Sequence, residues 1–421
     1  MAAILLKNIS VGELRRDLLI EGGIIKKMAA AGACSGWDLA GDLESVDCDG
    51  KAAVPGFINM HAHASMSLMR GVGEDMKFHD WLAHVWRLEA KIDPEFIYAA
   101  AKVACLEMIR TGTTAFNDQY WHSPETRRAA AEMGIRAALG YTLLDNFDAK
   151  KAEQERRNAA EDYERWKDSP IYVLSCHSVY TVSEETIRWA SDFVRRNGIP
   201  MHIHLSETRK EVEDCKAAHG GLTPVEYLDS LGVLGPEVIA GHCLWLSEHD
   251  VQLLGAAGVT CVHNINSNAK LASGYRFLYN ELRDAGANVC LGTDGCASSN
   301  NLDMLEAMKT AALFQKAWRD DPAALPLPEL MKLSTENGAK ALGINAGRIE
   351  EGALADIAIV DTDNSFFLSP ASFAANFVYS AHSDCIDSLI CGGRFVMRHR
   401  EVPGERDILA RAHGIMKEIC G

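Results

Sequence analysis

The sequence lacks the features of membrane, secreted and nucleic-acid-binding proteins. No stretch approaches the roughly 18 consecutive apolar residues of a membrane-spanning helix, and residues 1–10 lack the charged-then-apolar plan of a signal peptide. The chain has fewer basic than acidic residues: 42 Lys and Arg and 58 Asp and Glu give it a formal net charge of −16. Such a charge opposes binding to nucleic acid and to anionic membrane surfaces. We therefore expect a cytoplasmic protein without polyanionic partners.

Several sequence motifs are also missing. The 12 cysteines form no C-x-x-C pair, so we expect small buried hydrophobic residues in a reducing compartment rather than disulfides or thiolate metal ligands. The chain has no P-loop and no dinucleotide-binding fingerprint. The combination of H-x-E with P-C-x-x-C, which marks the zinc deaminases that edit nucleic acid bases, is absent as well.

What the chain does contain is a repeated pattern of short apolar segments. Buried parallel strands have nearly continuous apolar runs of this kind. The eight segments cover residues 53–63, 114–118, 136–141, 172–177, 201–205, 238–242, 260–263 and 288–294. Amphipathic stretches with helix end signals separate them, such as Ser183 before Glu184 and Glu185. The alternation predicts an α/β protein with a (β/α)8 TIM barrel, which needs roughly 250 of the 421 residues.

The two ends of the chain differ from this pattern. Residues 1–55 and 346–421 contain short β-rich runs broken by Gly and Asp, such as residues 356–360 and 388–393. We expect both ends to fold together into one small composite β-sandwich, beside a metal-dependent barrel formed by residues 56–345.

Histidines and an acid recur at the carboxyl ends of the predicted strands, where a TIM barrel carries its chemistry. His61 and His63 are two residues apart on one strand, so their side chains share a face. His204 ends the fifth strand and Asp294 the eighth. Three imidazoles and a carboxylate leave a coordination position for water, whose pKa a bound metal lowers to about 7. The set predicts a catalytic site for one divalent metal ion.

Other polar residues near these strand ends are candidates for catalysis. Glu207 follows His204 by three residues, where a carboxylate is within reach of a bound water and a substrate nitrogen, as a general acid or base must be. His242 and His177 end the sixth and fourth strands and are candidates to polarise the reacting centre or hold substrate. His202 faces the same way as His204 but one layer deeper, so we assign it to the core. His263 leads into a polar loop, residues 264–268, that either lines the pocket or turns the chain.

Taken together, these motifs resemble the amidohydrolase superfamily. They are PGFINMHAH at residues 55–63, HLSE at 204–207, GHC at 241–243, the segment 263–274, and GTDG at 292–295. Within the superfamily they resemble the branch that holds S-adenosylhomocysteine and methylthioadenosine deaminases, guanine and cytosine deaminases, and triazine hydrolases. The resemblance implies one zinc, or iron, per subunit on His61, His63, His204 and Asp294. It also implies a homodimer or higher homo-oligomer.

The same resemblance implies roles for individual residues. Asp294 would accept a proton from the metal-bound water, Glu207 would shuttle protons to the ring nitrogen and the leaving ammonia, and His242 would help to activate the carbon under attack. The substrate contacts that it implies are Trp81, Glu89, His177 and Ser298.

The reaction expected from this resemblance is hydrolytic deamination of an adenosine-type nucleoside: methylthioadenosine, adenosine, 5′-deoxyadenosine or S-adenosylhomocysteine. Deamination or hydrolysis of a free ring, such as guanine, an oxidised purine, cytosine or a triazine, is the alternative, and an inactive metal-binding scaffold is a remote one. The S-adenosylhomocysteine enzymes of this branch carry arginines near the end of the third strand, which bind the carboxylate of the substrate. Here Tyr141 ends that strand and residues 145–148 contain no arginine, which disfavours a substrate with a carboxylate. A two-metal hydrolase would need a lysine where Cys176 and His177 stand. Ile265 replaces a usual proline, a change that we expect to be tolerated.

Overall fold

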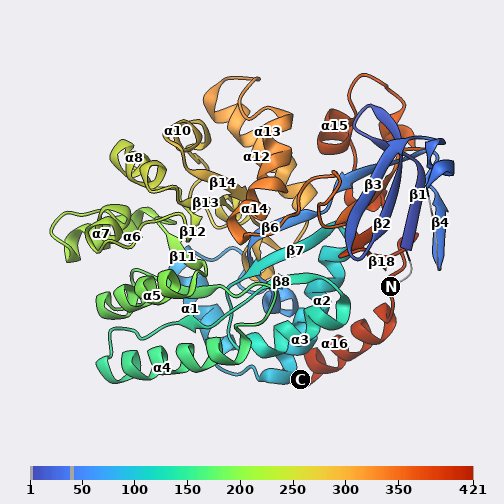
Figure 1. The fold of residues 1–421 in the computed structure, drawn as a ribbon. Helices are drawn as coiled ribbons and strands as arrows, with labels where there is room; N and C mark the ends of the chain where they lie inside the picture. Colours follow the sequence, from blue (N-terminus) through green and yellow to red (C-terminus); the bar gives the residue numbers. More distant parts are fainter. Residues whose placement is uncertain (1–2, 38–41, 421) are drawn as a thin grey trace.

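The computed structural model describes residues 3–37 and 42–420, and its central feature is a parallel β-barrel (Figure 1). The eight barrel strands are β6 (Phe57–His63), β7 (Thr113–Asp118), β8 (Arg136–Ala138), β10 (Leu174–Ser178), β11 (Met201–Leu205), β12 (Val238–His242), β13 (Thr260–His263) and β14 (Asn288–Leu291). Two-residue strands, β9 (Thr142–Leu143) and β15 (Asp294–Gly295), extend the sheet edges. A bridge from Leu139 to Tyr172 and a bond from Thr293 N to the carbonyl of His61 (3.1 Å) join the two barrel sheets. The predicted (β/α)8 fold is confirmed.

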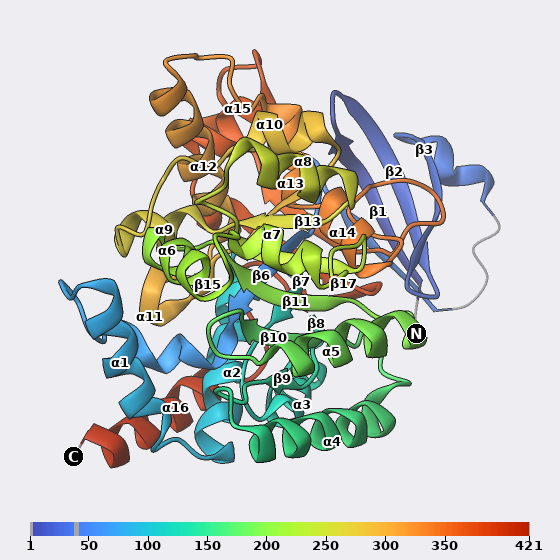
Figure 2. The same ribbon diagram turned by 90° about the vertical axis from the view of Figure 1, so that its left-hand side faces the viewer.

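Helices surround the barrel strands as an outer layer (Figures 1 and 2). They are α1 (Phe78–Glu89), α2 (Pro94–Arg110), α3 (Ser123–Met133), α4 (Ala149–Trp166), α5 (Glu184–Asn197), α6 (Arg209–Ala218), α7 (Pro224–Ser230), α8 (Glu248–Ala256), α9 (Ile265–Lys270), α10 (Tyr279–Ala285), α11 (Cys296–Ser299), α12 (Met304–Arg319), α13 (Leu327–Leu333) and α14 (Glu336–Leu342). Helix α2 shows why the ends lie where they do: Asp93 accepts the N–H of Phe96 at 2.8 Å, and Pro94 occupies the first helical position.

The barrel strands are buried along nearly their whole length. Every residue of β7, β11 and β12 is buried, as expected for parallel strands covered on one face by helices and filled on the other by barrel side chains. Phe57, Ile58 and Met60 of β6 belong to this core. The polar residues at the strand ends are therefore held on a rigid, close-packed frame.

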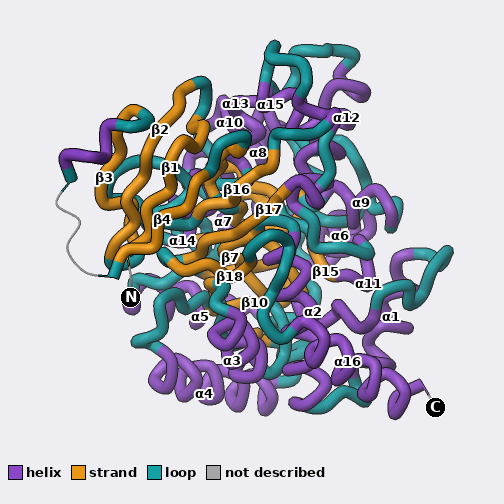
Figure 3. The backbone as a smooth tube through the Cα atoms, turned by 90° about the vertical axis from the view of Figure 1, so that its right-hand side faces the viewer, coloured by secondary structure: helices purple, strands orange, loops and turns teal. Residues whose placement is uncertain are grey.

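Strands from both chain ends form a second sheet beside the barrel (Figure 3). Its members are β1 (Ala3–Val11), β2 (Leu14–Glu21), β3 (Ile24–Ala30), β4 (Leu43–Asp47), β5 (Lys51–Pro55), β16 (Ile357–Asp361), β17 (Ile386–Cys391) and β18 (Arg394–Met397). The antiparallel pair β5–β16 joins the amino-terminal part to the carboxyl-terminal part. Both chain ends thus fold together as predicted, while the limits 1–55, 56–345 and 346–421 stay a prediction.

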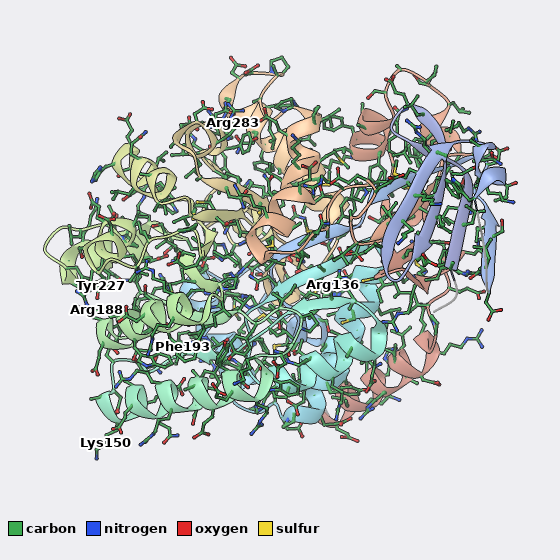
Figure 4. All side chains as sticks on the ribbon, viewed as in Figure 1. Arg136, Lys150, Arg188, Phe193, Tyr227 and Arg283 are labelled. Atoms are coloured by element: carbon green, nitrogen blue, oxygen red, sulfur yellow. The ribbon has the colours of Figure 1, made fainter. Side chains whose placement is uncertain are left out.

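Two connections tie this sheet and the chain terminus to the barrel. Arg136 of β8, labelled in Figure 4, forms an ion pair with buried Asp356 just before β16. Helix α16 (Glu405–Cys420) returns to the barrel and lies beside α2, where Arg411 pairs with Glu95 (Figure 1). Among the described residues, no helix is long and apolar enough to cross a membrane.

Candidate active site

Four of the predicted metal ligands converge at the carboxyl end of the barrel. His61 and His63 come from β6, His204 from β11, and Asp294 from β15. Asp294 Oδ1 lies 3.4 Å from His61 Nε2 and 3.1 Å from His63 Nε2, and the Nε2 atoms of His63 and His204 are 3.4 Å apart. The structure therefore brings together one oxygen and three nitrogen donors from opposite sides of the barrel mouth.

The remaining ring nitrogens show that this cluster is arranged for a cation. Nδ1 of His63 contacts the carbonyl of Gln119 at 2.5 Å, and Nδ1 of His204 contacts the carbonyl of His177 at 2.8 Å. Because a carbonyl only accepts, both rings carry their proton on Nδ1, and their Nε2 lone pairs face one another. Among the described residues, buried His61 Nε2 has no hydrogen-bond partner. Lone pairs converging in this way fit a divalent metal ion.

Asp294 is held as an ionised ligand. Ser267 donates its hydroxyl to Oδ2 at 2.5 Å, and the N–H of Gly295 donates to Oδ1 at 2.9 Å. Burial by itself raises the pKa of Asp294, but the neighbouring His61 and His63 outweigh burial and hold that pKa well below its usual range.

Glu207 and His242 lie next to this cluster. Burial, followed by the charges of Asp294 and Glu211, raises the pKa of Glu207 well above its ordinary value. Burial lowers the pKa of His242 to about 3, so its ring is neutral. His242 Nδ1 is 2.9 Å from the side-chain amide nitrogen of Asn268 and 3.8 Å from Glu207 Oε1. The carboxyl of Glu207, with its raised pKa, and the neutral imidazole of His242 thus face the same space.

His242 also lies at ligand distance from the cluster. A ring nitrogen of His242 and those of His61 and His204 all lie within 4.8 Å of one another. The sequence predicted that His242 polarises the reacting centre or holds substrate. Its ring nitrogen lies close enough to those of His61 and His204 to contact either a bound ion or the substrate.

The backbone is strained at the same strand ends. Ser206, His242, Cys243 and Asp294 have φ angles of 51°, 73°, 47° and 63°, the left-handed region that residues other than glycine rarely adopt. Each such residue costs about 1–3 kcal/mol and persists only where the surrounding structure enforces it. Nothing in the sequence pattern indicated this strain, because these positions are not glycines.

The structure places the other predicted site residues around one pocket of about 60 Å³. Its walls include His63, Trp81, Glu89, His177, His204, Glu207, His242, Asp294 and Ser298. His61 lies behind this wall and is fully buried. Residues that were predicted from strands, from the loop after β11, and from helices α1 and α11 therefore share a single cavity.

Several wall residues were not predicted. Gln119, Tyr120 and Trp121 follow β7, and Tyr180 follows β10. Their position just after the end of a barrel strand is the one feature of the sequence that could have identified them as pocket residues. Tyr120 donates its hydroxyl to Glu89 Oε1 at 2.6 Å, which fixes the carboxylate of Glu89 at the pocket edge.

A larger cavity of about 760 Å³ adjoins the pocket and shares Trp86, Glu89, Tyr120, Trp121 and Thr142 with it. Tyr141 lies in its wall, as does Lys151, which is the one lysine or arginine among the described residues that line it. Acidic residues outnumber this cation, since Glu89, Glu155 and Asp162 line the same cavity.

Comparison with known proteins gives consistent matches over most of the chain. The model of the amidohydrolase family matches residues 52–396. The 5′-deoxyadenosine deaminase of Methanoregula boonei is 47% identical over 374 residues, which is 88% of this chain and 84% of the relative. The 5-methylthioadenosine/S-adenosylhomocysteine deaminase 1 of Archaeoglobus fulgidus is 39% identical over 427 residues, 99% of each chain.

A solved structure gives the same result. The crystal structure of an adenosine deaminase from Xanthomonas campestris with bound zinc has a TM-score of 0.92 and 30% sequence identity, and the match covers 99% of this chain and 98% of that one. The family resemblance inferred from the strand-end motifs is thus confirmed, and the protein belongs to the amidohydrolase family.

Proposed function

We propose that this protein is a metal-dependent deaminase that releases ammonia from the purine ring of an adenosine-type nucleoside. One observation carries the proposal. Three of the four cluster residues, the carboxyl of Glu207 with its raised pKa, and the anchored carboxylate of Glu89 line one pocket. The first two suit hydrolysis of a ring amine, and the third suits recognition of a sugar hydroxyl. The relatives at 47% and 39% identity are named as deaminases of such nucleosides.

We infer that the metal is zinc and that His61, His63, His204 and Asp294 hold it. Three nitrogens and one oxygen are a usual zinc donor set, and the adenosine deaminase of similar structure binds zinc. When bound, such an ion supplies a nucleophile at neutral pH because it lowers the pKa of a water ligand to about 7.

The residues around the cluster then divide the proton transfers. Glu207 keeps its proton at pH values where an exposed glutamate has lost it, so it donates to the ring nitrogen beside the carbon under attack. Ionised Asp294 accepts the proton of the attacking water. Neutral His242 donates a hydrogen bond to the oxygen that attacks the ring carbon. One water is consumed and the carbon–nitrogen bond breaks. One proton of the water leaves in the ammonia, the ring nitrogen keeps the proton from Glu207, and the second proton of the water restores Glu207.

The outer cavity favours nucleosides with an uncharged 5′ group. A substrate carboxylate placed there would meet Lys151 but also Glu89, Glu155 and Asp162. A net excess of acidic groups disfavours a negatively charged substituent. We therefore propose 5′-deoxyadenosine, methylthioadenosine and adenosine ahead of S-adenosylhomocysteine.

Replacement of Glu89 separates the nucleoside from the free-base alternative. Loss of a charge-assisted hydrogen bond to a sugar hydroxyl should raise KM for 5′-deoxyadenosine about 10- to 100-fold. Ammonia release from 5′-deoxyadenosine and from adenine is compared for the wild type, Glu89→Ala and the control Asp80→Ala, which changes an exposed acid of the same helix. Unchanged nucleoside KM in Glu89→Ala, or turnover of the base in preference to the nucleoside, contradicts the proposal.

A further inference from the structure

His202 lies directly behind the metal-ligand cluster. It occupies β11 two residues before His204, and its side chain is completely buried. Its ring packs edge-on against that of His61, with centroids 4.9 Å apart and an interplanar angle of 89°. Its Nε2 is 2.9 Å from Nδ1 of His61. The residue assigned to the core from the sequence is buried, and it also contacts a ligand-bearing ring.

His61 differs from the other two histidines of the cluster in the partner of its Nδ1. Backbone carbonyls contact Nδ1 of His63 and of His204, and a carbonyl can only accept a hydrogen bond. The partner of His61 is an imidazole nitrogen, which either donates or accepts. Which nitrogen of His61 keeps a free lone pair therefore depends on the proton arrangement of His202.

Asn117 of β7 holds the far side of His202. Its side-chain nitrogen is 3.1 Å from His202 Nδ1 and donates to the carbonyl of Met60 at 3.1 Å, while its buried side-chain oxygen has no partner. A half-turn of this amide, which gives up the bond to Met60, presents an acceptor to His202 in place of a donor. Acceptance of the His61 proton by Nε2 of His202 therefore requires the amide to turn, at the cost of the bond to Met60.

We propose that His202 is a positioning residue for His61, whose Nδ1–H it accepts so that Nε2 of His61 is free for the metal. The proposal rests on the metal site described above. Partners of this kind, which orient a ligating histidine, typically contribute 10- to 100-fold to metal affinity. The role uses hydrogen bonding and not packing alone, so a side chain with an acceptor at the same place should fulfil it.

Zinc affinity tests the proposal without relying on turnover. The full-length protein is stripped of metal, and the Kd for Zn²⁺ is measured by competition with a chromophoric chelator. His202→Leu removes the acceptor and should weaken zinc binding about 10- to 100-fold. His202→Gln retains an acceptor and should bind zinc within about threefold of the wild type.

A matched control is available in the next strand but one. His263 ends β13 and is equally buried, and its ring stacks on Phe277 with centroids 4.2 Å apart. Neither of its ring nitrogens has a hydrogen-bond partner. His263→Leu should therefore leave the Kd for Zn²⁺ unchanged. Circular dichroism of each metal-free variant identifies those that fold.

Two results would overturn the proposal: zinc binding by His202→Leu within about threefold of the wild type, or an equal loss in His202→Leu and His202→Gln. If His202→Leu does not fold, the comparison of His202→Gln with the wild type decides. If the wild type binds zinc and deaminates nucleosides, and His202→Leu binds zinc equally well, only the role of His202 is refuted. A wild-type protein that binds no metal refutes the proposed function instead.

Discussion

Glu211 supports the loop that carries Glu207, and its replacement by glutamine is expected to disturb both stability and turnover. Glu211 is buried in the first turn of α6. One of its oxygens accepts the N–H of Ser206 and the other that of Glu207, both at 2.7 Å. Glutamine keeps the shape but turns one acceptor into a donor, so one buried N–H loses its partner. A displaced Glu207 should lower kcat/KM about tenfold or more.

The effect on stability depends on pH. Burial raises the pKa of Glu211 from 4.5 to about 7, although backbone N–H groups act against burial. Because the folded pKa exceeds the unfolded value, protonation stabilises the fold below 4.5, and this stabilisation is lost as the pH rises through about 7. With these two pKa values, the wild type loses about 1.4 kcal/mol of unfolding free energy between about pH 6 and about pH 8.5. The glutamine variant cannot titrate there.

Urea unfolding of the wild type and Glu211→Gln at both pH values, with saturating metal, measures this difference. Titrating groups distant from Glu211 contribute equally to both proteins and cancel in the comparison, whereas Glu207, whose pKa the charge of Glu211 raises, does not. Glu213→Gln is the matched control, since Glu213 lies on the same helix with its side chain exposed. The reasoning is refuted if the stability gap between wild type and Glu211→Gln is the same at both pH values, or if Glu213→Gln produces an equal change.

Two glycine substitutions test the packing around the site. In Gly292→Ala the new Cβ would lie 2.5 Å from Asn264 Oδ1 and 2.8 Å from the backbone nitrogen of His61, so we expect a loss of about 1–3 kcal/mol in stability and weaker zinc retention on a desalting column. Gly414→Ala, in the exposed interior of α16, meets no atom within 4 Å and should stabilise the protein by about 0.5–1 kcal/mol in thermal unfolding. Equal effects of the two changes would contradict this account.

The barrel and the donor cluster were predictable because both follow from short-range patterns. Apolar runs predict buried parallel strands, and strand ends meet at one barrel face, so His61, His204 and Asp294 had to lie close together. The segment 53–63, which was predicted as one strand, nevertheless contains parts of two strands, β5 and β6. Residues 51–55 belong to the second sheet, and the barrel strand begins at Phe57, after Gly56, where a Cβ would lie 2.3 Å from Thr114.

The remaining features depend on tertiary contacts that no local pattern encodes. Ser183 precedes α5 as predicted, but its hydroxyl donates to Asp145 at 2.6 Å and does not cap the helix. The contact of His202 with His61, 141 residues apart in the chain, likewise arises from packing between elements. Sequence periodicity identifies which residues face the barrel mouth, but hydrogen-bond partners are decided by neighbours distant in the chain.

Helix α1 has a consequence for the catalytic cycle. Phe78, Trp81, Leu82, Val85, Trp86 and Glu89 of this helix all line the pocket. Its free volume of about 60 Å³ is far below the roughly 300 Å³ or more of ordinary ligand sites. We therefore expect α1 to move away from the barrel mouth when a nucleoside enters and when its product leaves. We expect the rate of that opening, set by how firmly the apolar face of α1 adheres to the barrel mouth, to limit how fast the enzyme can cycle.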